Sequence, residues 1–187
     1  MQFGLFYEHQ SPAPFTAEKD RVIFHNALDE LELADQLGYD YAWLVEHHFL
    51  EEYSHSSAPE VFLGALSQRT KRMRLGHGIC VMPPKINHPA RVAERIATLD
   101  LLSNGRVEWG TGESGTAVEL EGFGVHPDEK KGMWREATEQ TANMLAMTPY
   151  PGFEGEHFSM PTRNIVPKPL QGPHPPLWVA CSRRDTI

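Results

Sequence analysis

The chain has 187 residues, of which 40% are hydrophobic and 22% are charged, and its formal net charge is −8 at pH 7. This composition is ordinary for one soluble globular domain with a core of its own, and it is not typical of a disordered chain. The acidic balance argues against a nucleic-acid groove, which needs clustered lysine and arginine side chains. No apolar run approaches the length of a membrane span and no signal-peptide pattern opens the chain, so we expect a cytoplasmic protein that uses no membrane.

The first part of the chain predicts two strand–helix pairs. A strand is expected over residues 2–7, and a helix from about Asp20, where apolar residues recur at helical spacing until Gly38 supplies the C-terminal stop. The apolar run 41–45 predicts a second strand, buried on both faces. Pro59 then opens a second helix.

The same alternation continues through the middle of the chain. A third strand is expected over residues 74–81, and a third helix opens at Pro89 and runs to about Asn104. A fourth strand over 106–111 leads into a long glycine-rich connection, and a fourth helix is expected over 129–147.

The last part of the chain is rich in proline. Residues 148–176 hold eight of the chain's 15 prolines, so this segment cannot be regular helix, and a short hairpin is expected near residues 155–158. A fifth strand is expected over 177–181. Cys80 and Cys181 each fall inside an expected strand, where a thiol behaves as a small buried hydrophobe. Without a cysteine framework, a reducing compartment is the default.

Strand–helix alternation of this kind predicts a parallel sheet covered by helices, and two architectures compete for it. A doubly wound sheet fits the length, but its dinucleotide-binding versions need a glycine-rich first turn, and residues 8–12 contain no glycine. A (β/α)₈ TIM barrel needs about 250 residues, so the chain would supply only its first five strands and four helices. The chain stops at Ile187, where the helix after strand five should begin, and this favours the truncated barrel.

Polar or small residues follow each expected strand, at the end where parallel α/β folds bind ligands. In chain order they are Glu8 and His9, then Glu46, His47 and His48, then Met82 and Pro83, then residues 112–115, then residues 182–184. Gathered on one barrel face, they would form a pocket with a candidate general base and an anion site. Adjacent histidines on an extended segment point apart, and the chain has no H-x-H or HExxH spacing, so no metal site is expected. It also lacks the G-x-S-x-G elbow of a serine hydrolase.

Six collinear sequence blocks resemble those of the bacterial-luciferase-like flavin monooxygenases. The blocks are residues 2–6, 46–49 (Glu-His-His-Phe), 75–83, 88–91, 99–106 and 176–180. Any one of them is weak, but the series covers essentially the whole chain. The resemblance implies that residues 1–187 are the N-terminal part of a single TIM-barrel domain.

The resemblance also implies an activity. It implies an enzyme that uses reduced FMN (FMNH₂) and O₂ to oxidise a small organic substrate through a flavin C4a-peroxide, with a flavin reductase as the supplier of FMNH₂. A homo- or hetero-oligomer is expected. An F420-dependent oxidoreductase of the same fold and a non-catalytic flavin-binding or assembly fragment remain alternatives.

Site residues are carried over from the family by position. His47 matches the catalytic histidine near the flavin, and an imidazole titrates in the range that proton transfer needs. Glu46 would shape the pocket beside it. Gly78 and Ile79 match a position beneath the flavin ring where the family often has a non-proline cis peptide; a strand bulge is the structural alternative.

The residues expected around the cofactor's phosphate agree less well with the family pattern. Ser182 matches a serine that binds the FMN phosphate, and Arg183 would assist it. Glu113, however, stands where the luciferases have an arginine that contacts the phosphate, and a carboxylate there would repel it. This departure leaves open the phosphate position and the choice between FMN and F420.

Overall fold

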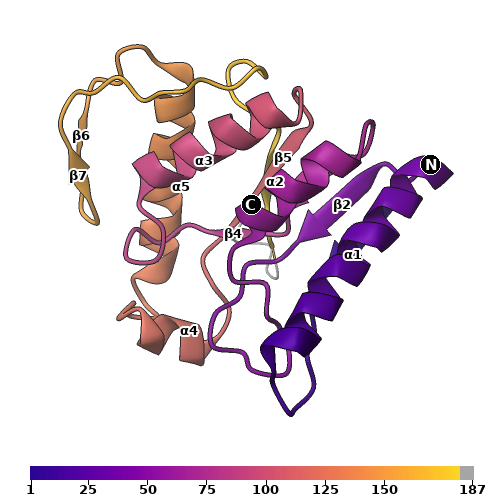
Figure 1. Cartoon of the computed structure of the whole chain (residues 1–187). Coiled ribbons are helices and arrows are strands. Elements are labelled where there is room, and N and C mark those ends of the chain that lie inside the picture. Colours follow the sequence, from indigo (N-terminus) through magenta and orange to yellow (C-terminus); the bar gives the residue numbers. More distant parts are fainter. Residues whose placement is uncertain (182–187) are drawn as a thin grey trace.

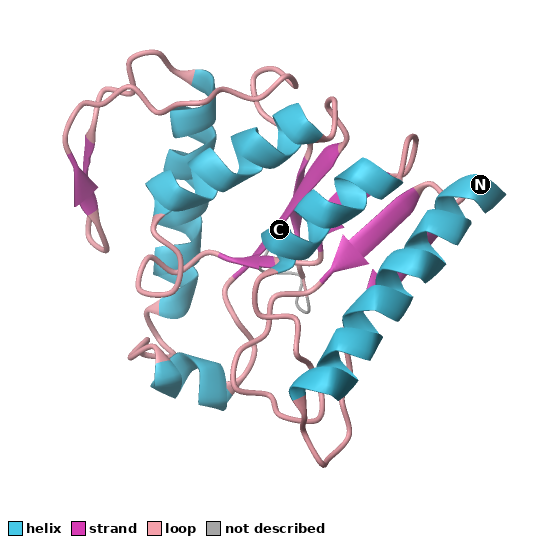
Figure 2. Cartoon of the chain, in the orientation of Figure 1, coloured by secondary structure: helices cyan, strands magenta, loops and turns pink. Residues whose placement is uncertain are grey.

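The computed structural model describes residues 1–181 as an α/β fold, in which helices cover a parallel sheet (Figures 1 and 2). In chain order the elements are β1 (Gly4–Tyr7), α1 (Ala17–Leu37), β2 (Tyr41–Leu44), α2 (Pro59–Arg69), β3 (Arg74–His77), β4 (Cys80–Val81), α3 (Pro89–Leu102), β5 (Val107–Gly112), α4 (Ala117–Gly122), α5 (Lys130–Ala146), β6 (Phe153–Glu154), β7 (Ser159–Met160) and β8 (Leu177–Val179).

The strands of the main sheet lie side by side in the order in which they occur in the chain. β1 pairs with β2, β2 with β3, β3 and then β4 with β5, and β5 with β8, and every pairing is parallel. A doubly wound sheet would reverse its order about the first strand. The observed order is that of a barrel wall, so the expectation of a truncated TIM barrel is confirmed.

Contact between two tryptophans shows that this wall is curved. Trp43 on β2 and Trp178 on β8 are separated by two strand positions, β3 and β5, and on a flat sheet their backbones would be about 14 Å apart. Their ring centroids are nevertheless only 5.5 Å apart. The side chains therefore converge on the concave face, which is the face that lines a barrel.

The convex face of the sheet and the inner faces of the helices form the core. Thr16 caps the N-terminus of α1, and Gly38 ends the helix in the left-handed conformation, with φ of 96°. Each large helix contributes completely or almost completely buried residues: Leu31 from α1, Leu63 from α2, Ile96 from α3 and Met144 from α5. From the sheet, these pack against Ala42, Leu44, Leu75 and Val107.

The sheet differs from the sequence-based expectation in four details. Trp43 is only half-buried, because its face of β2 lines the concave side. The expected strand 74–81 is interrupted at Gly78 and Ile79, between β3 and β4, as the bulge interpretation requires. The cis peptide expected there is not present, because every cis bond within residues 1–181 precedes a proline. Cys181 lies beyond the end of β8, where it is an exposed free thiol.

Two connections contain short elements of their own. The proline-rich segment forms the expected hairpin, in which β6 and β7 pair antiparallel and lie at the side of α5 in Figure 1. The glycine-rich connection after β5 contains the unexpected helix α4, which lies apart from the row of large helices, at the end of the molecule to which β2 points. No helix within residues 1–181 is long and apolar enough to span a membrane.

Candidate active site

A cavity of about 390 Å³ lies at the carboxyl ends of β1, β2, β4 and β5. This size falls within the range of small-molecule sites, roughly 300–1,000 Å³. Residues that the sequence singled out from four different segments meet on its wall: Glu8, Glu46, His47, Gly78, Ile79 and Glu113. The expectation that strand ends gather into one pocket is therefore met for these residues.

His47 is held at the wall of this cavity by its backbone and by one of its ring nitrogens. Its backbone N–H donates to the carbonyl of Ser56 at 2.9 Å, which holds the chain directly after β2. On the ring, Nδ1 donates to Oε1 of Glu119 at 2.9 Å. Nε2 faces Oε2 of Glu8 at 3.8 Å. The imidazole thus lies between two carboxylates, in contact with the cavity.

Glu119, from α4, is the anchor of this arrangement. Its side chain is 1% exposed, and it accepts hydrogen bonds from the hydroxyls of Ser114 and Thr116 and from the backbone N–H of His48. Burial alone would raise the pKa of Glu119, but the hydrogen bonds from His47, Thr116, Ser114 and the His48 amide outweigh it and lower the pKa to about 2. Glu119 is therefore a fixed negative charge at neutral pH.

The charge state of His47 follows from these neighbours. The hydrogen bond to Glu119 raises the pKa of His47, and the negative charges of Glu119, Glu8 and Glu46 add to this, while partial burial opposes it. The neighbours therefore favour the imidazolium form more than water does, which suits a histidine that both donates and accepts a proton.

His48 points away from His47 and has a packing role. Its ring stands edge-on to Phe123, with 4.9 Å between the centroids, and its Nε2 donates to Oε1 of Glu46 at 3.1 Å. Glu46 also accepts hydrogen bonds from the backbone N–H of Val81 and from the side chain of Asn87. The carboxylate of Glu46 thereby ties the end of β2 to β4, so it shapes the pocket wall.

The floor of the cavity needs glycine. A Cβ at Gly78 would lie 2.8 Å from Cε2 of Phe6, and a Cβ at Gly112 would lie 2.7 Å from Cδ1 of Ile79. Because both positions are glycine, the side chains of Phe6 and Ile79 lie directly against the backbone, and this part of the wall is apolar. Such a surface fits a planar aromatic ring system.

The opposite part of the wall carries mixed charge. Glu113 lines the cavity, and its Oε2 is buried without a hydrogen-bond partner among residues 1–181. Lys130, at the start of α5, lines the cavity too and donates from Nζ to the carbonyl of Ser114 at 2.8 Å. Ser182 and Arg183, expected to bind a phosphate, lie outside the described residues.

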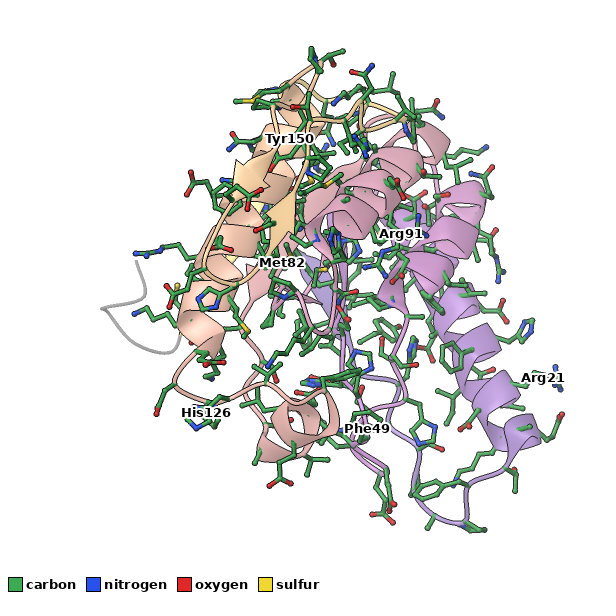
Figure 3. All side chains as sticks on the ribbon, turned by 90° about the vertical axis from the view of Figure 1, so that its left-hand side faces the viewer. Arg21, Phe49, Met82, Arg91, His126 and Tyr150 are labelled. Carbon is green, nitrogen blue, oxygen red and sulfur yellow. The ribbon has the colours of Figure 1, made fainter. Side chains whose placement is uncertain are left out.

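Sequence reasoning missed Glu119 and Lys130. One signal was available for the former, since residues 116–119 have the T-x-x-E pattern of a helix-capping box. Thr116 is indeed the N-cap of α4, and its hydroxyl accepts from the N–H of Glu119. Figure 3 shows Phe49, from the His47 loop, beside this short helix.

Comparison with curated proteins places the chain among monooxygenases. It is 37% identical, over its whole length, to an uncharacterised protein of Sinorhizobium fredii, of which it covers 52%. It is 30% identical, over 96% of its length, to the oxygenase component of a flavin-dependent trigonelline monooxygenase of Acinetobacter baylyi, of which it covers 49%. The chain thus spans about half the length of these relatives.

Solved structures agree with this result. A monooxygenase of Streptomyces bottropensis superposes with a TM-score of 0.88 at 32% identity, over 97% of this chain and 54% of that one. At 20% identity, the FMN-bound oxygenating constituent of 3,6-diketocamphane monooxygenase from Pseudomonas putida shares the fold, with a TM-score of 0.84 over 96% of this chain and 51% of that one. An F420-dependent secondary alcohol dehydrogenase does so at 23% identity, with a TM-score of 0.78 over 95% and 51%.

A sequence model described as luciferase-like monooxygenase matches residues 1–187. This match extends from the first strand to the last and includes every residue of the cavity described above. The cavity, the strand order and the relatives lead to the same assignment, and the chain belongs to the luciferase-like monooxygenase family.

Proposed function

We propose that the chain is the N-terminal part of an FMNH₂-dependent monooxygenase that uses O₂ to oxidise a small organic substrate. The observation that carries this proposal is His47, an imidazole held between two carboxylates at a glycine-floored cavity. The flavin-dependent trigonelline monooxygenase and the FMN-bound neighbour support the choice of cofactor. Bound reduced flavin would supply the activation of O₂.

The cavity offers different surfaces to the two ends of such a cofactor. Gly78, Ile79 and Phe6 would lie against the flat ring system. At the phosphate end, Lys130 is the basic side chain that lines the cavity within residues 1–181, and we propose that Ser182 and Arg183 complete the site. Glu113 opposes a phosphate close to it.

In this proposal His47 handles the proton of the reaction. Glu119 fixes the tautomer by accepting from Nδ1, so that Nε2 is the nitrogen that exchanges protons on the cavity side. Phe6, Ile79 and Val81 supply apolar lining to the same cavity. Glu46 holds the segments that carry His47 and Val81 together.

The test is a cofactor and oxygen assay on the full-length protein. Binding of reduced FMN, followed by flavin absorbance, and O₂ uptake coupled to a hydroxylated or ring-expanded product would support the proposal. Binding of FMN without any O₂ uptake would contradict it. Because FMN and F420 differ in absorbance, the same measurement identifies the cofactor.

A second candidate is an F420-dependent oxidoreductase, which transfers hydride and needs no O₂. Glu113 leaves the choice of cofactor open, because this carboxylate stands where the family resemblance places an arginine for the FMN phosphate. The F420-dependent neighbour has the same fold. Reduction of a carbonyl substrate by reduced F420 under anaerobic conditions would establish this candidate. A third candidate is a flavin-binding or assembly fragment without turnover, for which flavin would bind but neither assay would give a product.

We also propose partners. The trigonelline relative is the oxygenase component of its enzyme, and this supports a separate flavin reductase as the source of FMNH₂. A cytoplasmic homo- or hetero-oligomer is proposed for the complete enzyme. Addition of a reductase with NADH should then replace chemically reduced FMN in the assay.

A further inference from the structure

Glu8, directly after β1, presents a buried carboxylate oxygen to the catalytic histidine candidate. Its Oε2 lies 3.8 Å from Nε2 of His47. This oxygen is buried and has no hydrogen-bond partner within residues 1–181. The other oxygen, Oε1, accepts from the hydroxyl of Tyr53 at 3.3 Å. Tyr53 thus fixes one oxygen of Glu8 and leaves the second one facing the imidazole.

The position of Glu8 selects one protonation state of His47. A neutral imidazole carries a single N–H, and here that proton is on Nδ1, which donates to Glu119. The lone pair of Nε2 would then face the negative Oε2 of Glu8, which is repulsive. Only the imidazolium presents an N–H to both carboxylates. The pair of carboxylates therefore favours a proton on the cavity side of the ring.

Other charged groups around His47 do not take the place of Glu8. The titratable groups that face His47 or line a cavity with it come from six segments. They are Glu46 after β2, Glu51, Tyr53 and His55 in the loop that follows, Asp20 on α1, Glu113 after β5, Glu119 on α4, Lys130 on α5 and Cys181 after β8. Glu46 is engaged by Val81, Asn87 and His48, and Lys130 by a backbone carbonyl. The nearby negative charge of Glu8 also raises the pKa of Tyr53.

We propose that Glu8 is a positioning residue that keeps a proton on Nε2 of His47, and so sets the pH range in which this nitrogen can deliver it. The proposal rests on the proposed function insofar as the proton is used in oxygenation. The charge coupling itself is a property of the chain without any cofactor.

Histidine titration by NMR tests the coupling directly. In the full-length protein, labelled with ¹³C and ¹⁵N in histidine, a His47→Gln variant identifies the ring signals of His47. Glu8→Gln keeps an acceptor for Tyr53 but removes the charge, and we expect the titration midpoint of His47 to fall by about one pH unit. Glu121→Gln, on the exposed surface of α4, changes the net charge equally and should leave the midpoint in place. An unchanged midpoint in Glu8→Gln overturns the proposal.

The second measurement is the pH profile of oxygenation in the full-length protein. Loss of the Glu8 charge should move the alkaline limb of the profile to lower pH, in step with the NMR midpoint. Glu8→Asp keeps the charge, so its alkaline limb should lie closer to that of the parent protein. A lower rate at every pH with an unmoved limb means a merely structural role and contradicts the proposal. If no flavin supports turnover, the proposed function fails, while a shifted NMR midpoint still upholds the coupling.

Discussion

His47 allows binding and chemistry to be separated. Its ring lies on the cavity wall, whereas the apolar floor is built by other residues, so the loss of the ring should leave flavin affinity nearly normal. We expect His47→Ala to lower substrate oxygenation by about 10²–10⁴-fold, which is roughly 3–5 kcal/mol in barrier height. Reduced flavin should still consume O₂ and release hydrogen peroxide. Product, hydrogen peroxide and flavin affinity are measured together.

His48 provides the matched control. Its ring contacts Phe123 and Glu46 and lies outside the cavity lining, so His48→Ala should lower the melting temperature more than it lowers turnover per folded molecule. Normal oxygenation in His47→Ala, or failure because flavin no longer binds, would refute the role of His47.

His9 should make the stability of the fold depend on pH. Its ring is packed between Phe24 and Phe62, it is 4% exposed, and neither nitrogen has a partner within residues 1–181. Burial lowers its pKa from 6.5 to about 4. Because the unfolded chain binds this proton more tightly, stability is complete above pH 6.5 and is lost as pH falls toward 4.

The free energy of unfolding should fall by about 3 kcal/mol between pH 7 and pH 4 because of His9. His9→Asn does not titrate and tolerates the left-handed backbone, with φ of 52° at this position. Urea unfolding of this variant should show a weaker dependence on pH than the parent. His126→Asn, at an exposed histidine, should leave the dependence as it was. Equal slopes for His9→Asn and the parent would exclude His9 as the cause.

Two glycines in different elements should respond oppositely to the same substitution. A Cβ at Gly110, in β5, would lie 2.0 Å from the backbone oxygen of His77, and a backbone atom cannot move aside cheaply. At Gly64, in α2, a Cβ would meet nothing within 4 Å. Gly110→Ala should therefore prevent correct pairing of β3 with β5, whereas Gly64→Ala should stabilise the protein by up to about 1 kcal/mol. Thermal unfolding compares both variants. A folded Gly110→Ala protein as stable as the parent would show that Gly110 does not lie this close to the backbone oxygen of His77.

Long periodic elements were readily predicted from the sequence, and short ones were not. The apolar spacing of α1 and the prolines at the start of α2 and α3 are properties of each segment alone. These helices can therefore be predicted without knowledge of their tertiary contacts. The break at Gly78 and Ile79 is accompanied by a contact from a distant segment, since Glu46, after the end of β2, accepts from the N–H of Val81. Such a tertiary contact leaves no periodic trace in the sequence.

The candidate site was predictable to the same extent. His47 follows a recognisable buried strand and matches a family position, so it was found. Glu119 lies 72 positions further on and meets His47 only because α4 folds back over the strand ends. A single glutamate in a glycine-rich connection is too common a feature to signal that contact. Lys130, at the start of α5, was missed for the same reason.

The 187-residue chain by itself should associate or bind flavin weakly. Among residues 1–181, β1 pairs only with β2 and β8 only with β5, so both outer strands present unpaired backbone groups. Phe6 is 58% and Trp178 49% exposed on the same concave wall. Sedimentation velocity should show oligomers or aggregates at micromolar concentration. A monodisperse monomer of these residues with full oxygenase turnover would refute this expectation.

The contact between Trp43 and Trp178 also gives the protein an optical signature. The two indole planes meet at 81° with 5.5 Å between centroids, close enough for their electronic transitions to couple. Coupled indoles add a two-signed band to the circular-dichroism spectrum that neither ring produces alone. Since the rings meet only when the intervening strands are bent, the band disappears if the wall flattens, even where every helix persists. The chain thus carries a built-in chromophore pair that reports its curvature while a barrel assembles.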